Sequence, residues 1–483
     1  MRTILAAALM CLTLAACGPS IAPAKVPTVT GHAVDFYRGA HAETTQPHPT
    51  LPTMVAWGAR GDGNFDQLTV QTDGEGGFTI GSVTDAEYYL QLDGTWFVST
   101  SRELDLDVHG LLGHPASPGD AEGAAVTVSG TGGIDAKYSL LEVFTPDLGP
   151  PSPIVMFPGP TTGDFTGIAG SFTSFGGGLP AGTPGQESWV SEKMECVDAL
   201  ISLGGAPHGC MGRGSSTKVT GLAVDPSATV ALDFAFEPRT TQPLSASFDA
   251  TDALAHASDV NPGATPSALW YGLFVTPNAP GLKPVRATQP PLLLNIAFDP
   301  PSQGTGFGTA YADPFPAEWS RVQTWSYVFA TPAGVSGGSG VPASLSETRP
   351  ASSGQQTVTA RLSPPTRLTL DGAPAASDGT LAGLSPRLEW QQPAFGTPKG
   401  YLGIVYKRSD SPQALTPAQV FTFVTAGTHF QLPPGLLLAG SEYVFSVVAL
   451  DGPELDVNKA PLAYRWVIDL SMAQAVSGTW ATP

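Results

Sequence analysis

Short runs of alternating apolar and polar residues fill the first hundred residues of the chain and predict β-strands. In such a run every second side chain faces the same side of a sheet, so one face can be buried while the other meets solvent. The runs are separated by residues that favour turns, chiefly Gly, Pro and Asp. The predicted strands are residues 29–36, 54–57, 67–72, 78–80, 88–92 and 96–98. Strands and turns at this short spacing are typical of a β-sandwich.

The middle of the chain contains several strands with similar endings. Residues 138–146, 270–277 and 325–332 each run from an aromatic residue through apolar residues to Thr-Pro. Proline ends a strand ladder because it has no N–H to donate. Residues 234–238 and 296–300 also end in proline, after Phe and an acidic residue. The unequal spacing argues against a solenoid or a propeller, and we interpret the similarity as convergent chemistry of strand ends.

Composition supports the same fold class. Charged residues make up 13% of the chain, about half of the usual ~25%. The 56 glycines and 47 prolines fit turns between many short strands. Helical periodicity is weak, and the best helical candidate, residues 192–203, is short. With 483 residues, the chain is too long for one hydrophobic core, so we expect an all-β protein with several β-sandwich domains in a row.

The N-terminus has the features of an export signal. Arg2 precedes an apolar run over residues 4–14, which is shorter than the roughly 20 residues that span a membrane. The following Leu-Ala-Ala-Cys sequence, which ends at Cys17, resembles the lipobox of bacterial lipoproteins. That resemblance implies cleavage before Cys17 and acyl chains on this residue, palmitate among them. The alternative is an ordinary secretory signal with an accidental cysteine. By the same resemblance, Gly18 in place of Asp favours the outer membrane, with the protein facing the periplasm or the cell surface.

The charge of the chain excludes one class of partner. The formal net charge is −19, whereas proteins that bind nucleic acid present basic patches. The same charge argues against electrostatic adhesion to anionic lipid head groups. We therefore expect no nucleic-acid partner, and contact with the membrane through the lipid anchor.

Two cysteines remain after export, since Cys11 is lost with the signal and Cys17 carries the lipid. Cys196 and Cys210 form an even pair in an oxidising compartment, which favours a disulfide. The bridge would close a loop of about 15 residues and contribute roughly 3 kcal/mol. Two free thiols, or half of a metal site with His208, are the alternatives, although a tetrahedral zinc site needs more ligands than these.

The first sandwich resembles the carboxypeptidase regulatory-like, or prealbumin-like, family. The resemblance rests on a Val-Thr-Gly sequence ending at Gly31 and on a turn in which Asp73 is followed by Gly77 and Phe78. We expect Asp73 to cap the turn, Gly77 to take a positive φ, and Phe78 to return to the core. In this family such domains are accessory sandwiches, so the resemblance implies no catalysis.

The C-terminal segment resembles a fibronectin type III-like sandwich over residues 364–470. Residues 388–390 match a strand of such sandwiches whose tryptophan, here Trp390, faces inward. Residues 401–406 match the next strand. The pattern Leu-x-Gly-x-x-Tyr, which ends at Tyr443, resembles the tyrosine corner of such sandwiches. We expect Tyr401 and Val405 to share one face of their strand.

These features predict the organisation of the whole chain. The predicted segments are a signal peptide (1–16), a lipidated tether (17–27), a carboxypeptidase regulatory-like sandwich (28–110), a β-rich domain with a disulfide (112–245), a further β-rich domain that could form one unit with it (246–333), a Gly/Ser linker (334–360) and a fibronectin type III-like domain (361–483).

Several short motifs resemble parts of known sites but lack essential residues. Asp62, Asn64 and Asp66 begin like a calcium-binding EF-hand loop, but Gln67 stands where glycine must turn the chain and Asp73 stands where glutamate should end it. A polar hairpin loop explains them better. Four aromatic residues could form a sugar platform, but in sandwiches such residues more often fill the core; they are Trp270, Tyr271, Trp319 and Trp325.

Nucleophile motifs occur without their partners. Ser215 and Lys218 fit serine-x-x-lysine, but the Lys-Thr-Gly and Ser-Asp-Asn motifs of penicillin-recognising enzymes are absent. Residues 334–338 fit G-x-S-x-G inside a Gly/Ser-rich stretch instead of between a strand and a helix. The histidines form no H-E-x-x-H motif, and we interpret the pair His109 and His114, which lies in a Gly/Pro-rich stretch, as loop residues. The others are His32, His41, His48, His208, His256 and His429.

The sequence therefore assigns no catalytic residue, no metal ligand and no cofactor. Its leading hypothesis is a non-enzymatic lipoprotein of the cell envelope that binds envelope proteins or glycans, or acts as a spacer. The alternative is a lipid-anchored hydrolase of envelope glycan or peptide with its site in residues 112–356, because two carboxylates of a glycosidase pair can be distant in sequence. A weaker third hypothesis is an adhesin that uses calcium at residues 62–73.

Overall fold

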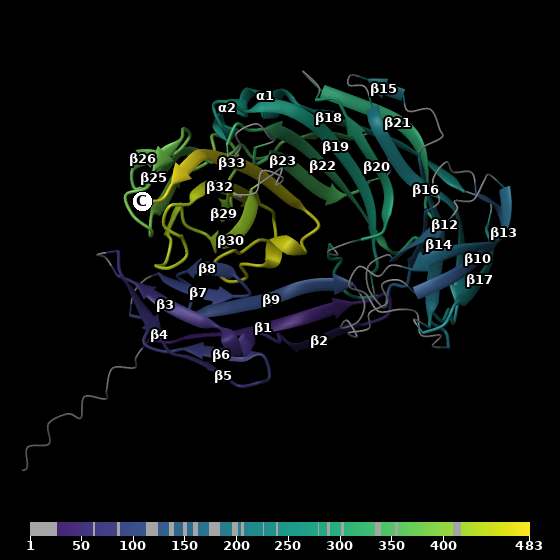
Figure 1. The fold of residues 1–483 in the computed structure, drawn as a ribbon, viewed down its shortest axis with the longest axis horizontal. Coiled ribbons are helices and arrows are strands. Elements are labelled where there is room, and N and C mark those ends of the chain that lie inside the picture. Colours follow the sequence, from purple (N-terminus) through teal and green to yellow (C-terminus); the bar gives the residue numbers. More distant parts are fainter. Residues whose placement is uncertain are drawn as a thin grey trace, which may run out of the picture.

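The computed structural model describes residues 27–483 apart from short segments, which are residues 61–62, 85–86, 113–123, 135–139, 148–151, 158–162, 173–183, 196–200, 204–206, 226, 238–239, 279, 287–289, 301–303, 334–339, 353–355 and 409–416. The described chain is nearly all β, which confirms the predicted fold class (Figure 1). Its helical elements are η1 (Leu51–Thr53), α1 (Thr251–Ala255), α2 (Ala257–Val260) and η2 (Ala463–Arg465). None of the helices in the described ranges has the length and apolar character needed to cross a membrane.

The N-terminal unit consists of two sheets that pack around a shared apolar core. The first contains β1 (Val29–Arg38), β2 (Glu43–Pro47), β5 (Val70–Thr72), β6 (Gly77–Ile80) and β9 (Glu103–Leu112). The second contains β3 (Val55–Ala59), β4 (Phe65–Leu68), β7 (Tyr88–Leu92) and β8 (Thr95–Ser99). The single strand predicted over residues 67–72 is wrong in one respect. The chain leaves one sheet after Leu68 and joins the other at Val70, because β4 pairs with β3 and β5 pairs with β6.

The predicted turn before Phe78 is present, with one correction. Oδ1 of Asp73 accepts hydrogen bonds from the backbone N–H groups of Glu75 and Gly77, both at 2.8 Å. The residues with positive φ are Gly74 (+79°) and Gly76 (+100°), and Gly77 is not one of them. Gly77 is needed for space instead, because a Cβ there would lie 2.2 Å from Oδ2 of Asp73. Phe78 is buried as predicted.

The C-terminal unit is a sandwich with the predicted landmarks. One sheet contains β25 (Thr366–Leu370), β26 (Ala373–Pro374), β28 (Arg387–Gln391) and β31 (His429–Gln431), and the other β27 (Gly379–Thr380), β29 (Gly400–Lys407), β30 (Ala418–Thr425), β32 (Glu442–Asp451) and β33 (Leu470–Ala481). Trp390 is buried between them. The hydroxyl of Tyr443 accepts a hydrogen bond from the N–H of Leu438 at 2.9 Å, which confirms the tyrosine corner.

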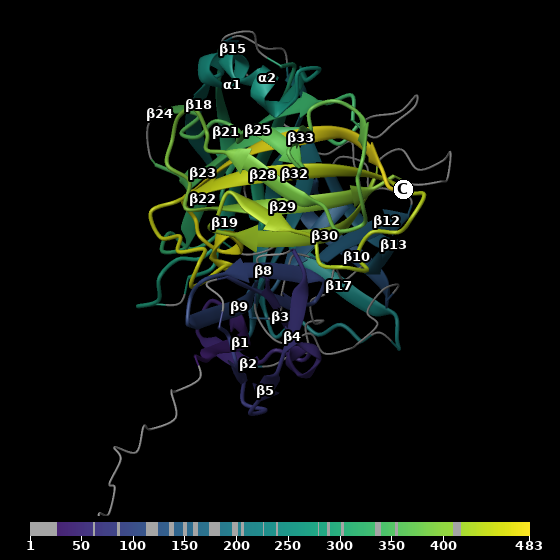
Figure 2. The same ribbon diagram turned by 90° about the vertical axis from the view of Figure 1, so that its left-hand side faces the viewer.

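Strand β29 is buried on both faces, and this joins the N-terminal and C-terminal units. Tyr401 and Val405 face the core of the C-terminal sandwich, as predicted, and Gly403 lies between them against the ring of Phe430. Leu402 on the opposite face packs into the core of the N-terminal unit. In addition, β8 pairs in parallel with β30. Figure 2 shows the N-terminal unit directly beneath these strands.

The middle of the chain forms a further sandwich. A small sheet contains β15 (Ile201–Leu203), β18 (Thr241–Asp249), β21 (Gly304–Ala312) and β24 (Gln356–Thr359). It packs on β19 (Thr265–Thr276), β20 (Leu292–Phe298), β22 (Ser320–Ala330) and β23 (Ala343–Pro350). β19 and β22, two of the three strands with Thr-Pro endings, pair directly.

The predicted linker over residues 334–360 is wrong in its second half. It contains β23, which pairs with β22 on one side and with β33 on the other, and also β24. β23 therefore continues the sheet of the middle sandwich into the C-terminal one. The Gly/Ser-rich residues that suggested a linker, 334–339, lie outside the described residues. Apolar residues of the middle and C-terminal units belong to one continuous core, so the two are not separated by a spacer.

The remaining strands form a closed ring with its own apolar core. They are β10 (Ala124–Ile134), β11 (Leu140–Phe144), β12 (Ser152–Phe157), β13 (Gly163–Phe172), β14 (Glu187–Glu195), β16 (Pro207–Thr220) and β17 (Val230–Ala235). A hydrogen bond from Glu237 N to Ser216 O, at 2.9 Å, links the end of β17 back to β16. The first half of β16 also pairs with β20, which attaches the ring to the middle sandwich.

The helix predicted over residues 192–203 is wrong. Glu187–Glu195 is strand β14 and Ile201–Leu203 is strand β15. β14 pairs with β11 and with β16. Pairing on both sides satisfies its backbone, so tertiary context overrides a weak local preference for helix.

The N-terminal unit also contacts the ring. Beyond β1, the N–H of Ala40 donates to Oδ1 of Asp147, which follows β11, at 3.0 Å. Phe36 of β1 packs against Trp466, which follows η2 in the C-terminal part of the chain, with ring centroids 6.0 Å apart. The first sheet thus extends from the C-terminal sandwich to the ring (Figure 1), and the described parts form one connected body.

Candidate functional site

The structure places one of the three predicted site residues. Cys210 is buried on β16, opposite Ile296 of β20. Cys17 and Cys196 lie outside the described residues, as does the side chain of His208. The lipid anchor and the disulfide therefore stay predictions.

The interpretation of His109 as a loop residue is wrong, because its backbone belongs to strand β9. The histidines whose side chains are described lie beside carboxylates. His48 is buried, with Nδ1 2.7 Å from Asp35 and Nε2 2.6 Å from Asp93. Burial lowers the pKa of His48, but its hydrogen bonds to the two carboxylates outweigh burial, and the net pKa is raised. The other pairs are His32 with Asp105 and Asp107, His41 with Asp147, His256 with Asp259, and His429 with Glu87. Of the remaining histidines, His109 and His114 have side chains outside the described residues.

The incomplete motifs gather no site among their described residues. Asp66 forms an ion pair with Arg60, and Asp73 binds its own turn, so the two do not converge as calcium ligands. Asp62 lies outside the described residues, like residues 334–338. Ser215 and Lys218 both lie on strand β16, and Lys218 forms an ion pair with Glu187 at 2.8 Å.

Most aromatic residues proposed for a sugar platform are in the core. Tyr271, Trp319 and Trp325 are buried, whereas 44% of Trp270 is exposed. Burial raises the pKa of Tyr271 well above its usual value. The core interpretation is therefore confirmed for three of the four.

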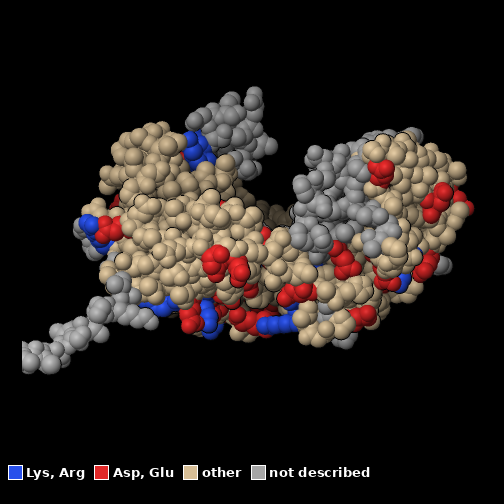
Figure 3. Space-filling model, turned by 90° about the horizontal axis from the view of Figure 1, so that it is seen from below, with Lys and Arg blue, Asp and Glu red and all other residues tan. Residues whose placement is uncertain are grey.

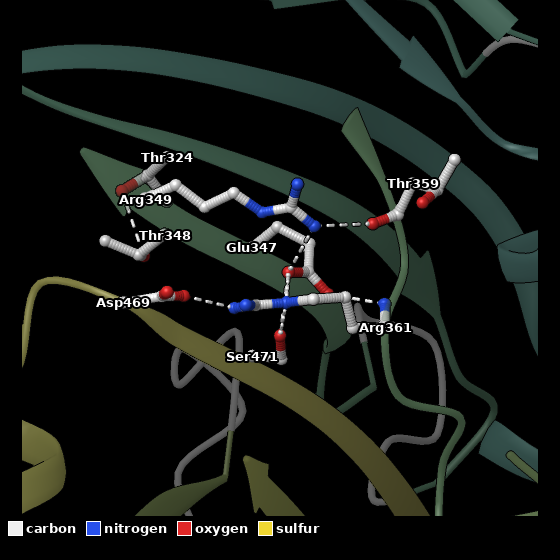
Figure 4. A network of polar contacts seen from close by, with 8 residues as sticks. All are labelled: Thr324, Glu347, Thr348, Arg349, Thr359, Arg361, Asp469 and Ser471. Carbon is white, nitrogen blue, oxygen red and sulfur yellow. Dashed lines mark hydrogen bonds and ion pairs between the residues drawn. The ribbon is translucent and has the colours of Figure 1, made fainter. Parts of the chain in front are cut away.

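A buried polar network lies at the joint between the middle and C-terminal sandwiches (Figure 4). Glu347 of β23 is 3% exposed. Its carboxylate accepts hydrogen bonds from the backbone N–H of Arg361 at 2.7 Å, from Nε of Arg361 at 2.9 Å and from Oγ of Ser471 at 2.7 Å. Arg349 adds a longer contact, and Arg361 also pairs with Asp469 at 2.6 Å. Each oxygen of Glu347 is occupied, so this network stabilises the joint and offers no group for chemistry.

The candidate site is a cleft of about 690 Å³ between the two sheets of the middle sandwich. Its volume is in the range of small-ligand sites. Leu244 of β18, Leu273 of β19, Tyr311 of β21 and Phe315 supply apolar surface. Neutral polar side chains lie beside them, namely Gln242, Ser245 and Ser352.

The charged residues of the cleft are paired with each other. Nε of Arg321 donates to Asp313 at 2.8 Å, and its other nitrogens donate to the carbonyls of Pro316 at 2.6 Å and Phe315 at 3.0 Å. Burial, and next the charge of Asp313, raise the pKa of Tyr311. Tyr311 therefore stays a neutral phenol that can donate a hydrogen bond.

This arrangement suits binding of an uncharged molecule. Neither a second carboxylate nor a histidine is among the described residues that line the cleft. The cleft was missed by sequence analysis because its walls come from segments that are distant in the chain and carry no motif. The space-filling view from below shows scattered acidic groups and fewer basic ones (Figure 3), in line with the net charge of −19.

Comparison with known proteins gives little further information. No protein-family model matches the chain, and no curated protein matches it. Among solved structures, it is similar to the crystal structure of the FN1-FN3 domains of chicken CNTN1 at 11% sequence identity, with 71% of this chain and 90% of that chain covered and a TM-score of 0.13. A TM-score this low carries no argument, so the assignment as an all-β protein with sandwich-type units rests on the strand pairing described above.

Proposed function

We propose that the protein is a non-enzymatic binding protein of the cell envelope, anchored to the outer membrane by lipid on Cys17. The export signal and the lipobox-like sequence support the address. The continuous sheets support a rigid body, because the N-terminal, middle and C-terminal units share cores. Such a body would hold a binding site at a constant distance from its anchor.

The observation that carries the binding role is the pairing of Asp313 with Arg321 in the cleft. Glycoside hydrolysis needs two carboxylates, one as acid and one as base or nucleophile. In the described lining of the cleft, Asp313 is the only carboxylate, and its side chain is 2% exposed. The hydrolase alternative within residues 112–356 therefore has no support at this site.

The lining favours a neutral glycan as the ligand. A sugar presents apolar ring faces, which suit Tyr311 and Leu244, and hydroxyl groups, which suit Gln242 and Ser245. A charged ligand would find no free counter-charge in the described lining, because Arg321 is fully engaged.

The test is calorimetric titration of the full chain, in a non-glycosidic detergent, with neutral oligomers of glucose and of N-acetylglucosamine. We expect binding to one oligomer series, at least tenfold weaker in Tyr311→Ala and unchanged in Trp270→Ala, which removes an exposed aromatic residue outside the cleft. Loss of binding in Trp270→Ala alone would place the site on the outer face. No binding to either series would refute the glycan assignment, and turnover of any oligomer would favour the hydrolase.

The anchor and the disulfide have direct tests. Mass spectrometry of the membrane-extracted protein should show a mature chain that begins at an acylated Cys17, and Cys17→Ser should prevent this processing. A thiol count of zero in the native protein is expected if Cys196 and Cys210 are bridged, and a count of two would exclude the bridge.

A further inference from the structure

Three potential metal ligands meet on the outer face of the N-terminal unit. His32 lies on β1, and Asp105 and Asp107 lie on β9. The two strands pair in parallel, with His32 directly opposite Asp105. Alternation along the strands turns these side chains away from the core, into which Ala33, Leu104 and Leu106 point. The strand ladder therefore fixes the backbone of all three residues.

The donor atoms of the three residues lie close together. Nε2 of His32 lies 3.0 Å from Oδ1 of Asp105 and 3.4 Å from Oδ1 of Asp107, and one donor atom from each residue lies within 4.8 Å of the others. Zinc binds imidazole nitrogen and carboxylate oxygen at about 2.0–2.2 Å. Neighbouring ligands on one such ion are then about 3.0 to 3.5 Å apart, which matches both distances.

A second observation separates this cluster from an ordinary ion pair. Oδ1 of Asp105 is buried, and its 3.0 Å ion pair with Nε2 of His32 does not have the geometry of a hydrogen bond. His48 provides the contrast, because it presents a different ring nitrogen to each of its two carboxylates and hydrogen-bonds to both. At His32, one nitrogen and two oxygens face the same point, which is the geometry of ligands around an ion.

We propose that His32, Asp105 and Asp107 bind a divalent transition-metal ion of the zinc class, with water in the remaining coordination positions. Imidazole favours zinc and its neighbours over magnesium and calcium, and two carboxylates neutralise a divalent charge. His32 is 49% exposed at its side chain, so the ion has access from solvent. The ion would connect β1 to β9, the strand at the edge of the sheet. This inference is independent of the glycan cleft.

The test is a titration of the full chain with Zn²⁺ after chelator treatment, followed by equilibrium dialysis and metal analysis. We expect one zinc per chain. Affinity should fall at least about tenfold in His32→Gln and in Asp107→Asn, because even residues outside the first ligand sphere cost about 10–100-fold when mutated. The matched control is His41→Gln, which removes an exposed histidine that has one carboxylate partner.

Zinc K-edge absorption of the loaded wild-type protein gives a readout that needs no variant. One imidazole nitrogen with oxygen ligands, and no sulfur, is expected. Sulfur ligation would assign the ion to the cysteines. Absence of binding to the wild-type protein, or equal affinity in His32→Gln and His41→Gln, would overturn the proposal.

Discussion

Replacement of Glu347 by glutamine tests whether the middle and C-terminal sandwiches form one folding unit. Glu347 lies on β23, the strand that joins the two sheets. Glutamine keeps the shape of the side chain but removes its charge. It also places an NH₂ group where Arg361 and Ser471 now donate hydrogen bonds, so donors would face donors.

The size of the effect follows from burial. Removal of one partner from a buried ion pair costs about 3–5 kcal/mol. Arg361 is 30% exposed and keeps Asp469 as a partner, so we expect the lower end of that range, about 3 kcal/mol. The matched control is Glu389→Gln on the C-terminal sandwich. Glu389 is 43% exposed and pairs with Arg387, and such exposed pairs contribute about 0–1 kcal/mol.

Urea unfolding of the full chain, followed by tryptophan fluorescence, measures both variants. We expect Glu347→Gln to move the transition of both sandwiches together to lower urea, because their cores are continuous. A loss equal to that of the control would show that the buried charge does not stabilise the joint. Two separate transitions, with one of them unchanged, would show that the sandwiches fold independently.

Three further predictions concern single residues. Gly403→Ala should destabilise the protein by about 1–3 kcal/mol, because the added Cβ would lie 2.1 Å from the ring of Phe430. The control is Gly383→Ala, where a Cβ meets open space, and equal urea midpoints for the two variants would contradict the prediction. The raised pKa of His48 means that its charged form stabilises the fold; that contribution is complete below about pH 6.5 and is lost as pH rises through the raised pKa. The melting temperature of His48→Gln should therefore approach that of wild type at higher pH, and a constant difference would refute the assignment. Tyr443→Phe should cost about 0.5–1.5 kcal/mol in urea unfolding, because it removes the half-buried hydrogen bond from the N–H of Leu438, and an unchanged midpoint would exclude a stabilising corner.

Sequence analysis predicted the strands well because their signal is local. Alternation along residues 401–406 assigned both faces of β29, and the spacing before Tyr443 predicted its corner. The turn at Asp73 followed from side-chain capping, which depends on neighbours in sequence. The error at Gly77 arose because the constraint there is a contact with Asp73 and not a backbone angle.

The errors in organisation have a different cause. The linker over residues 334–360 and the helix over 192–203 were inferred from local composition, but β23 and β14 are strands because neighbours on both sides complete their hydrogen bonds. Pairing between distant strands is not encoded by the residues of either strand alone. The boundaries between units were therefore the weakest part of the prediction.

The sequence by itself determined the all-β class and the local turns, because these depend on periodicity and on short motifs, and the membrane address is a prediction from its first residues. Only the tertiary structure decided that the sandwiches share cores and that Asp313 is tied to Arg321 within a cleft. It also brought His32 beside Asp105, far away in the chain, through the parallel pairing of β1 with β9. Sites of this kind are set by which strands become neighbours, and the free energy that selects those neighbours comes from burial of apolar surface across the whole fold.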